Sequence, residues 1–82
     1  MSGSLTVIGL GPGDPRYLTP AAAAALAEAT DLVGYQPYCD RVPERQGLAR
    51  HGSDNRVEVD RARHALNLAA AGRRVAVVSG GD

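Results

Sequence analysis

Two short stretches decide the fold: LTVIGLGPGD at residues 5–14 and VAVVSGGD at residues 75–82. Each stretch begins with apolar, partly β-branched residues and ends in glycines followed by an aspartate. Apolar runs of this kind are typical of strands that are buried on both faces of a parallel sheet. The sequence therefore predicts two core strands, at residues 5–10 and 75–78, each followed by a glycine-rich loop.

The segment between the two stretches carries helix and strand signals. Thr19 is a suitable N-cap, Pro20 suits the first helical position, and the alanines that follow favour a helix over residues 20–29. The run DLVGY at residues 31–35 predicts another buried strand. Residues 36–53 contain two prolines and predict only a short helical turn, with a loop over residues 47–52.

A second helix is expected from about Asn55 to Gly72. Asn55 and Glu58 have the spacing of a capping box, and Gly72 is a typical residue for a helix end. Arg73 and Arg74 follow, where positive charge favours a helix C-terminus. Four residues at helical spacing predict its buried face: Val59, Ala62, Leu66 and Ala69.

The order of elements is strand, helix, strand, helix, strand. This βαβαβ pattern predicts an α/β fold, with a parallel sheet and right-handed crossovers. Residues 1–82 give no sign of a second domain, and the chain ends at the turn after a core strand. Because a further element normally covers such a strand, we expect residues 1–82 to be an incomplete domain.

Composition narrows the range of partners. The nine basic residues are all arginine and are matched by nine acidic residues, without a run of like charge. Nucleic acid and anionic membranes are therefore not expected as partners. The sequence has no apolar run long enough for a membrane span and no signal peptide pattern. With a single cysteine, Cys39, these features predict a cytoplasmic protein.

Both glycine-rich loops are expected at the carboxyl edge of the sheet, where ligands of parallel α/β proteins bind. Gly9, Gly11 and Gly13 do not fit the dinucleotide spacing, since Asp14 occupies the place of the third glycine. The absence of lysine excludes a Walker phosphate loop. An aspartate suits a ligand with amino or hydroxyl groups, such as S-adenosylmethionine, better than a phosphate. A dinucleotide-binding oxidoreductase domain is the alternative.

The first stretch, with the alanine-rich helix after it, resembles the opening motif of the tetrapyrrole (corrin/porphyrin) methylases, and VVSGGD at residues 77–82 resembles their second motif. The strings GYQPYCD at residues 34–40 and SDNR at residues 53–56 resemble the branch that acts in cobalamin biosynthesis. That branch methylates precorrin-3B at C17 with ring contraction to precorrin-4. The resemblance implies the truncated N-terminal domain of a two-domain, dimeric methyltransferase that uses S-adenosylmethionine and releases S-adenosylhomocysteine.

The resemblance also implies roles for the loop residues. Four positions match residues that contact the methyl donor: Pro12, Gly80, Gly81 and Asp82. Gly11, Gly13 and Asp14 match the loop that faces the tetrapyrrole cleft, where Asp14 would act as a base or a polar contact. As an alternative, Asp14 only caps the following turn. No metal is required for the methylation.

The remaining candidates follow from side-chain chemistry. Tyr35 could pack on a flat macrocycle and Arg56 could bind its carboxylates, although covering the sheet edge and forming a solvated helix face are alternatives. Cys39 is expected to be an inert small residue, and His51 a solvated residue of the loop 47–52. His64 is expected on the helix surface. A fragment without turnover also remains open, because half of the cleft would be missing.

Overall fold

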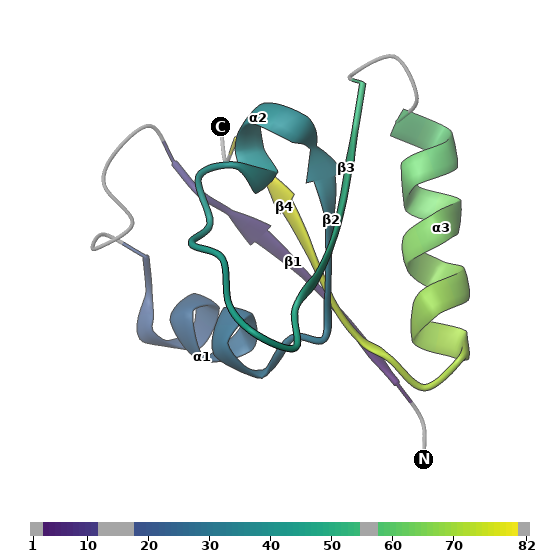
Figure 1. Cartoon of the computed structure of the whole chain (residues 1–82), viewed down its shortest axis with the longest axis horizontal. Coiled ribbons are helices and arrows are strands. Elements are labelled where there is room, and N and C mark those ends of the chain that lie inside the picture. The colour runs from purple at the N-terminus through teal and green to yellow at the C-terminus, as the bar shows by residue number, and fades with distance from the viewer. Residues whose placement is uncertain (1–2, 12–17, 55–57, 81–82) are drawn as a thin grey trace.

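A computed structural model describes residues 3–11, 18–54 and 58–80 of the chain (Figure 1). Its elements in chain order are β1 (Ser4–Gly9), α1 (Pro20–Glu28), β2 (Asp31–Tyr35), α2 (Gln36–Cys39), β3 (Ala49–Ser53), α3 (Glu58–Ala70) and β4 (Arg74–Ser79). The strands form one parallel sheet in the order β1-β4-β2-β3. The predicted α/β class is confirmed, with β3 as an additional strand.

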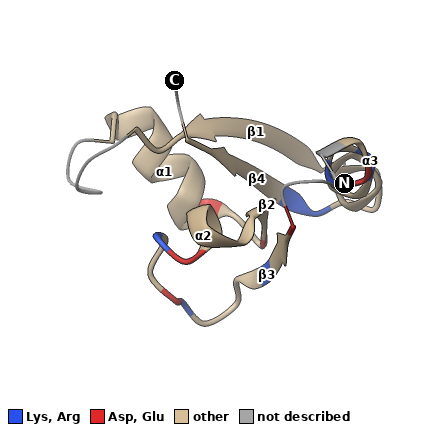
Figure 2. Cartoon of the chain, turned by 90° about the horizontal axis from the view of Figure 1, so that it is seen from above, with Lys and Arg blue, Asp and Glu red and all other residues tan. Residues whose placement is uncertain are grey.

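The helices cover the two faces of the sheet (Figure 2). Leu26 of α1 and Cys39 of α2 pack with Ile8 and Val78 on one face, whereas Ala65 of α3 packs with Val75 on the other. The β1–α1–β2 and β3–α3–β4 connections run in opposite directions across the sheet. Right-handed crossovers therefore place α1 and α3 on opposite faces.

Helix α1 begins where the sequence predicts. The hydroxyl oxygen of Thr19 accepts a hydrogen bond from the backbone N–H of Ala22 at 3.1 Å, and Pro20 is the first helical residue. At the other end, Arg45 Nη2 donates to the carbonyls of Leu26 at 3.0 Å and Ala29 at 2.6 Å. The guanidinium thus adds a second donor to the Leu26 carbonyl, which also accepts from the Ala29 N–H at 3.3 Å, and a donor to the Ala29 carbonyl just past the helix end.

Helix α3 ends as predicted, but its buried face differs. Gly72 has φ 93°, and the N–H groups of Gly72 and Arg73 donate to the carbonyls of Ala69 and Leu68, which is a Schellman motif. In the predicted face only Ala69 packs in the core, while Val59 is 72% and Leu66 is 62% exposed.

The buried face of α3 is instead formed by Ala65, Leu68 and Ala69, and Ala62 is exposed. Two short alanine side chains at this face let the helix lie close to the sheet. The larger Val59 and Leu66 therefore stay on the flank of α3. None of the helices in the described ranges is long and apolar enough to cross a membrane.

The expectation of a loop over residues 47–52 is wrong, because Ala49–Ser53 forms strand β3. It pairs in parallel with β2, with Asp31 opposite Ala49 and Tyr35 opposite Ser53. Its sequence, ARHGS, lacks the apolar alternation by which strands are recognised. An edge strand needs only one neighbouring strand, and here polar side chains make its further contacts.

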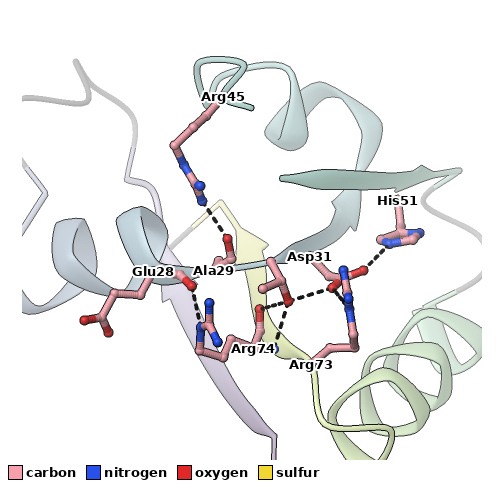
Figure 3. Close-up of polar contacts among 8 residues, drawn as sticks. Glu28, Ala29, Asp31, Arg45, His51, Arg73 and Arg74 are labelled. Atoms are coloured by element: carbon pink, nitrogen blue, oxygen red, sulfur yellow. Dashed lines mark hydrogen bonds and ion pairs between the residues drawn. The ribbon is translucent and has the colours of Figure 1, made fainter. Parts of the chain in front are cut away.

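One of these contacts belongs to a buried polar cluster at the amino end of β2 (Figure 3). Asp31 is 2% exposed and accepts hydrogen bonds from His51 Nε2 at 2.9 Å, Arg73 Nε at 2.7 Å and the Thr30 hydroxyl at 2.8 Å. His51 is therefore a member of this cluster and not a solvated loop residue. Its ring also meets the exposed His64 edge-on, with centroids 4.8 Å apart.

Burial raises the pKa of Asp31, but the hydrogen bonds from His51, Thr30 and Arg73 and the Arg73 charge outweigh burial and leave the pKa below its ordinary value. A carboxyl whose pKa is lowered by folding stabilises the fold above its unfolded pKa, and this stabilisation is lost as the pH falls. Arg73, which follows the end of α3, thus pairs with Asp31 at 2.7 Å.

We therefore expect the free energy of unfolding to fall as the pH is lowered below about 4, and Asp31→Asn to remove part of this dependence. Asp31→Ala should cost about 2 kcal/mol at neutral pH, because it leaves the hydrogen-bond donors of the cluster without their acceptor. Urea unfolding at several pH values measures both effects. Asp60→Asn, on the exposed side of α3, is the control, and an equal effect there would contradict the assignment.

Candidate functional site

The carboxyl ends of the four parallel strands define the candidate site. Gly9 at the end of β1 is paired with Ser79 at the end of β4, and Tyr35 of β2 is paired with Ser53 of β3. Helix α2 lies beside the ends of β2 and β4 at the top of Figure 1. This is the edge at which parallel α/β proteins bind their ligands.

The two glycine-rich loops start side by side, because β1 and β4 are hydrogen-bonded neighbours. The backbone N–H of Leu10 donates to the carbonyl of Ser79 at 2.9 Å. Gly11 follows with φ 68°, a conformation that glycine adopts without strain. The predicted location of both loops at one edge is thus confirmed for their described residues, Gly11 and Gly80.

Two tyrosines occupy the same edge. Tyr35 and Tyr38 make an edge-to-face contact with ring centroids 5.3 Å apart and an interplanar angle of 80°. A Cβ atom added to Gly80 would lie 2.9 Å from the hydroxyl oxygen of Tyr38, so this ring lies directly against the second loop. Tyr35 is half-buried at the end of β2. Its contact with the macrocycle stays a prediction.

Arg41 is a residue of this edge that the sequence analysis did not identify. Its Nη2 donates to the carbonyl of Gly11 at 2.6 Å and lies 3.4 Å from the carbonyl of Leu10. A single arginine between a helical turn and a proline carries no recognisable pattern, and these two carbonyls lie about 30 residues away in sequence. Only the folded arrangement of β1 and α2 reveals the contact.

Several predicted site residues lie outside the described ranges: Pro12, Gly13, Asp14, Arg56, Gly81 and Asp82. Their predicted roles therefore remain predictions. Within residues 3–11, 18–54 and 58–80, no three His, Cys, Asp or Glu side chains gather in a way that could hold a metal ion.

Cys39 is fully buried in α2, between the sheet and the turn that follows. Burial raises the pKa of its thiol, while the nearby Arg50 charge lowers it less strongly. Because the thiolate is the reactive form, this environment suits an inert core residue and not a nucleophile.

Taken together, the fold and the edge define a parallel α/β domain with two neighbouring glycine-rich loops at the edge where such domains bind ligands. The sequence profile of the tetrapyrrole (corrin/porphyrin) methylases matches residues 4–82. The chain belongs to this family.

Individual relatives agree with the family assignment. All 82 residues are 55% identical to part of the cobalamin biosynthesis protein CobIJ of Mycobacterium tuberculosis, covering 16% of that protein. They are 51% identical to part of the precorrin-3B C(17)-methyltransferase of a Sinorhizobium species, covering 32% of it. The crystal structure of the methyltransferase CobJ matches with a TM-score of 0.91 and 63% identity, over 95% of this chain and 33% of that one.

The chain thus spans a third or less of the length of these relatives. The comparison with CobJ also supports the fold, because 95% of the chain is matched at a TM-score of 0.91.

The burial of Cys39 leads to a direct test. We expect the native protein to react with a thiol reagent at neutral pH far more slowly than the urea-unfolded protein, because reaction requires opening of the core around α2. Absorbance after addition of a chromogenic disulfide measures the rate. Fast reaction of the native protein, with the fold intact by circular dichroism, would contradict this packing.

Proposed function

We propose that this chain is the N-terminal part of a C-methyltransferase that uses S-adenosylmethionine to methylate precorrin-3B at C17, with ring contraction to precorrin-4, in cobalamin biosynthesis. One observation carries the proposal: the two glycine-rich loops begin on adjacent strands, linked by the Leu10 to Ser79 hydrogen bond. The 51% identity to a precorrin-3B C(17)-methyltransferase supports the choice of substrate.

The described backbone fits a ligand at this edge. Among the described residues, no atom lies within 4 Å of the place where a Cβ of Gly11 would stand, so a ligand can approach the backbone there. We assign the methyl donor to Pro12, Gly80, Gly81 and Asp82. The oxygens of Asp82 would accept hydrogen bonds from the amino or ribose hydroxyl groups of the donor.

The tetrapyrrole would lie on the other side of the first loop, against Gly11, Gly13 and Asp14. Tyr35 would pack on the flat macrocycle, and Arg56 would bind one of its carboxylates. S-adenosylmethionine supplies an activated methyl group, so the main task of the protein is to align the reacting atoms. Asp14 would accept the proton that the ring loses or hold the ring by a hydrogen bond.

The complete enzyme would have a second domain that closes the cleft and would act as a cytoplasmic homodimer, with no nucleic acid or membrane partner. The share of the relatives that this chain covers supports a larger whole. A dinucleotide-binding oxidoreductase domain is the alternative, because its glycine loop also follows the first strand, but the family match over residues 4–82 argues against it.

Calorimetric titration separates these candidates. We expect the protein from its complete reading frame to bind S-adenosylhomocysteine with a dissociation constant in the micromolar range and not to bind NAD. Binding of NAD alone would overturn the methyltransferase proposal. The 82 residues by themselves should show no methyl transfer to precorrin-3B, and detectable turnover would refute the need for a second domain.

The role of Asp14 has its own test. Asp14→Ala should lower turnover of precorrin-3B by about 10²- to 10⁴-fold if the carboxylate removes a proton. Affinity for S-adenosylhomocysteine should stay within about twofold, since Asp14 is assigned to the substrate side. Asp60→Ala, on the exposed side of α3, is the matched control. Unchanged turnover in Asp14→Ala would remove this residue from the mechanism.

A further inference from the structure

One short segment touches both glycine-rich loops. It comprises α2 and the two residues after it, Gln36–Arg41, and we call it the bridging segment. Arg41 contacts the first loop through the carbonyls of Leu10 and Gly11, and Tyr38 lies against Gly80 of the second loop. We infer that Tyr38 and Arg41 are positioning residues, which hold the two loops at the separation that the methyl donor requires. This inference rests on the proposed function.

The hydrogen bond from Arg41 holds Gly11, which has no side chain with which to make contacts of its own. A glycine has no side chain to pack, and its backbone loses much conformational freedom when it is ordered. The 2.6 Å hydrogen bond from the guanidinium to the Gly11 carbonyl is charge-assisted and short. Because Arg41 is half-buried, solvent screens this bond only in part. The bond therefore holds the carbonyl group of Gly11, and with it the orientation of the backbone at this residue.

The side chain of Tyr38 restricts the position of Gly80 in the second loop. Its hydroxyl oxygen and Cζ would lie 2.9 and 3.2 Å from a Cβ added to Gly80, so a larger residue there would require the tyrosine side chain to shift. The edge-to-face contact with Tyr35 restricts the ring in turn. Gly80 can therefore not shift toward α2 without moving two aromatic rings.

The bridging segment is itself held firmly. Cys39 is fully buried in the core, and Arg50 Nη2 of β3 donates to the carbonyls of Cys39 and Val42, the latter at 2.8 Å. The backbone N–H of Arg41 donates to the carbonyl of Tyr38 at 3.1 Å. These contacts connect Tyr38 and Arg41 to each other and to the sheet, so both loops are contacted by one segment that is anchored in the core.

The chain offers a matched control for Arg41. Arg45 also donates from Nη2 to two backbone carbonyls, those of Leu26 and Ala29, but at the end of α1 and away from the glycine-rich loops. Arg41→Ala in the complete protein should weaken binding of S-adenosylhomocysteine about tenfold, as expected for the loss of one charge-assisted hydrogen bond. Arg45→Ala should lower the melting temperature but leave the affinity unchanged.

Hydrogen exchange provides a readout without ligand. In Arg41→Ala the amide of Leu10, which donates to Ser79, should exchange faster than in the parent protein, whereas in Arg45→Ala its rate should not change. Arg41→Lys should restore part of the affinity because the charge is kept. Tyr38→Ala should bind more weakly than the parent, since it removes both the hydroxyl oxygen and the ring that lie against Gly80. Tyr38→Phe, which removes only the hydroxyl oxygen, should bind with an intermediate affinity.

The outcomes separate the two proposals. If the parent protein does not bind S-adenosylhomocysteine, the proposed function is wrong, and the assignment of a methyl-donor site to this edge is wrong as well. If the parent binds and Arg41→Ala binds equally well, the proposed function stands and the positioning role is wrong. Equal losses of affinity in Arg41→Ala and Arg45→Ala would likewise overturn the inference, because they would reflect general destabilisation.

Discussion

The double pairing of β4 is the constraint on which the structure depends. Its backbone is bonded to β1 on one side and to β2 on the other, so Val75 stands between Leu5 and Asp31. This last strand of the chain therefore enters the middle of the sheet and completes the core on both faces. The same pairing brings the end of β4 next to the end of β1, although some 70 residues separate the two strands in sequence. The candidate site exists only where these ends meet.

The amino and carboxyl ends of the strands differ in the kinds of contact that they make. At the amino end of β2, the buried carboxylate of Asp31 is surrounded by donors from β3 and from the end of α3, so polar groups there serve the fold. At the carboxyl end, backbone groups and aromatic rings meet at glycines, and the side of Gly11 stays open among the described residues. The polar contacts at the amino edge thus belong to the fold, whereas at the carboxyl edge the described loop residues Gly11 and Gly80 are contacted by Arg41 and Tyr38.

The sequence was informative where one residue type determines local structure. Thr19 and Pro20 predicted the start of α1, Gly72 predicted the end of α3, and apolar runs predicted β1, β2 and β4. The sequence was uninformative where contacts between distant residues determine the structure. Strand β3 is polar because its partners are Asp31 and the carbonyls near α2, and the buried face of α3 follows small residues and not the most apolar ones. The contact of Arg41 with the carbonyls of Leu10 and Gly11 could not be predicted, because backbone atoms of a distant loop leave no pattern in the sequence.

Within the described ranges, four arginines donate to backbone carbonyls at 2.6 to 2.8 Å: Arg41, Arg45, Arg50 and Arg74. Arg61 makes a longer bond of the same kind, 3.3 Å to the carbonyl of Asp54. Their value thus lies in the planar guanidinium, which holds its donors at fixed angles and loses little freedom for each bond. Lysine would keep the charge but not this geometry. At these four positions the planar shape of the side chain therefore matters as much as its charge. The exchange of arginine for lysine, usually regarded as conservative, should be selected against there.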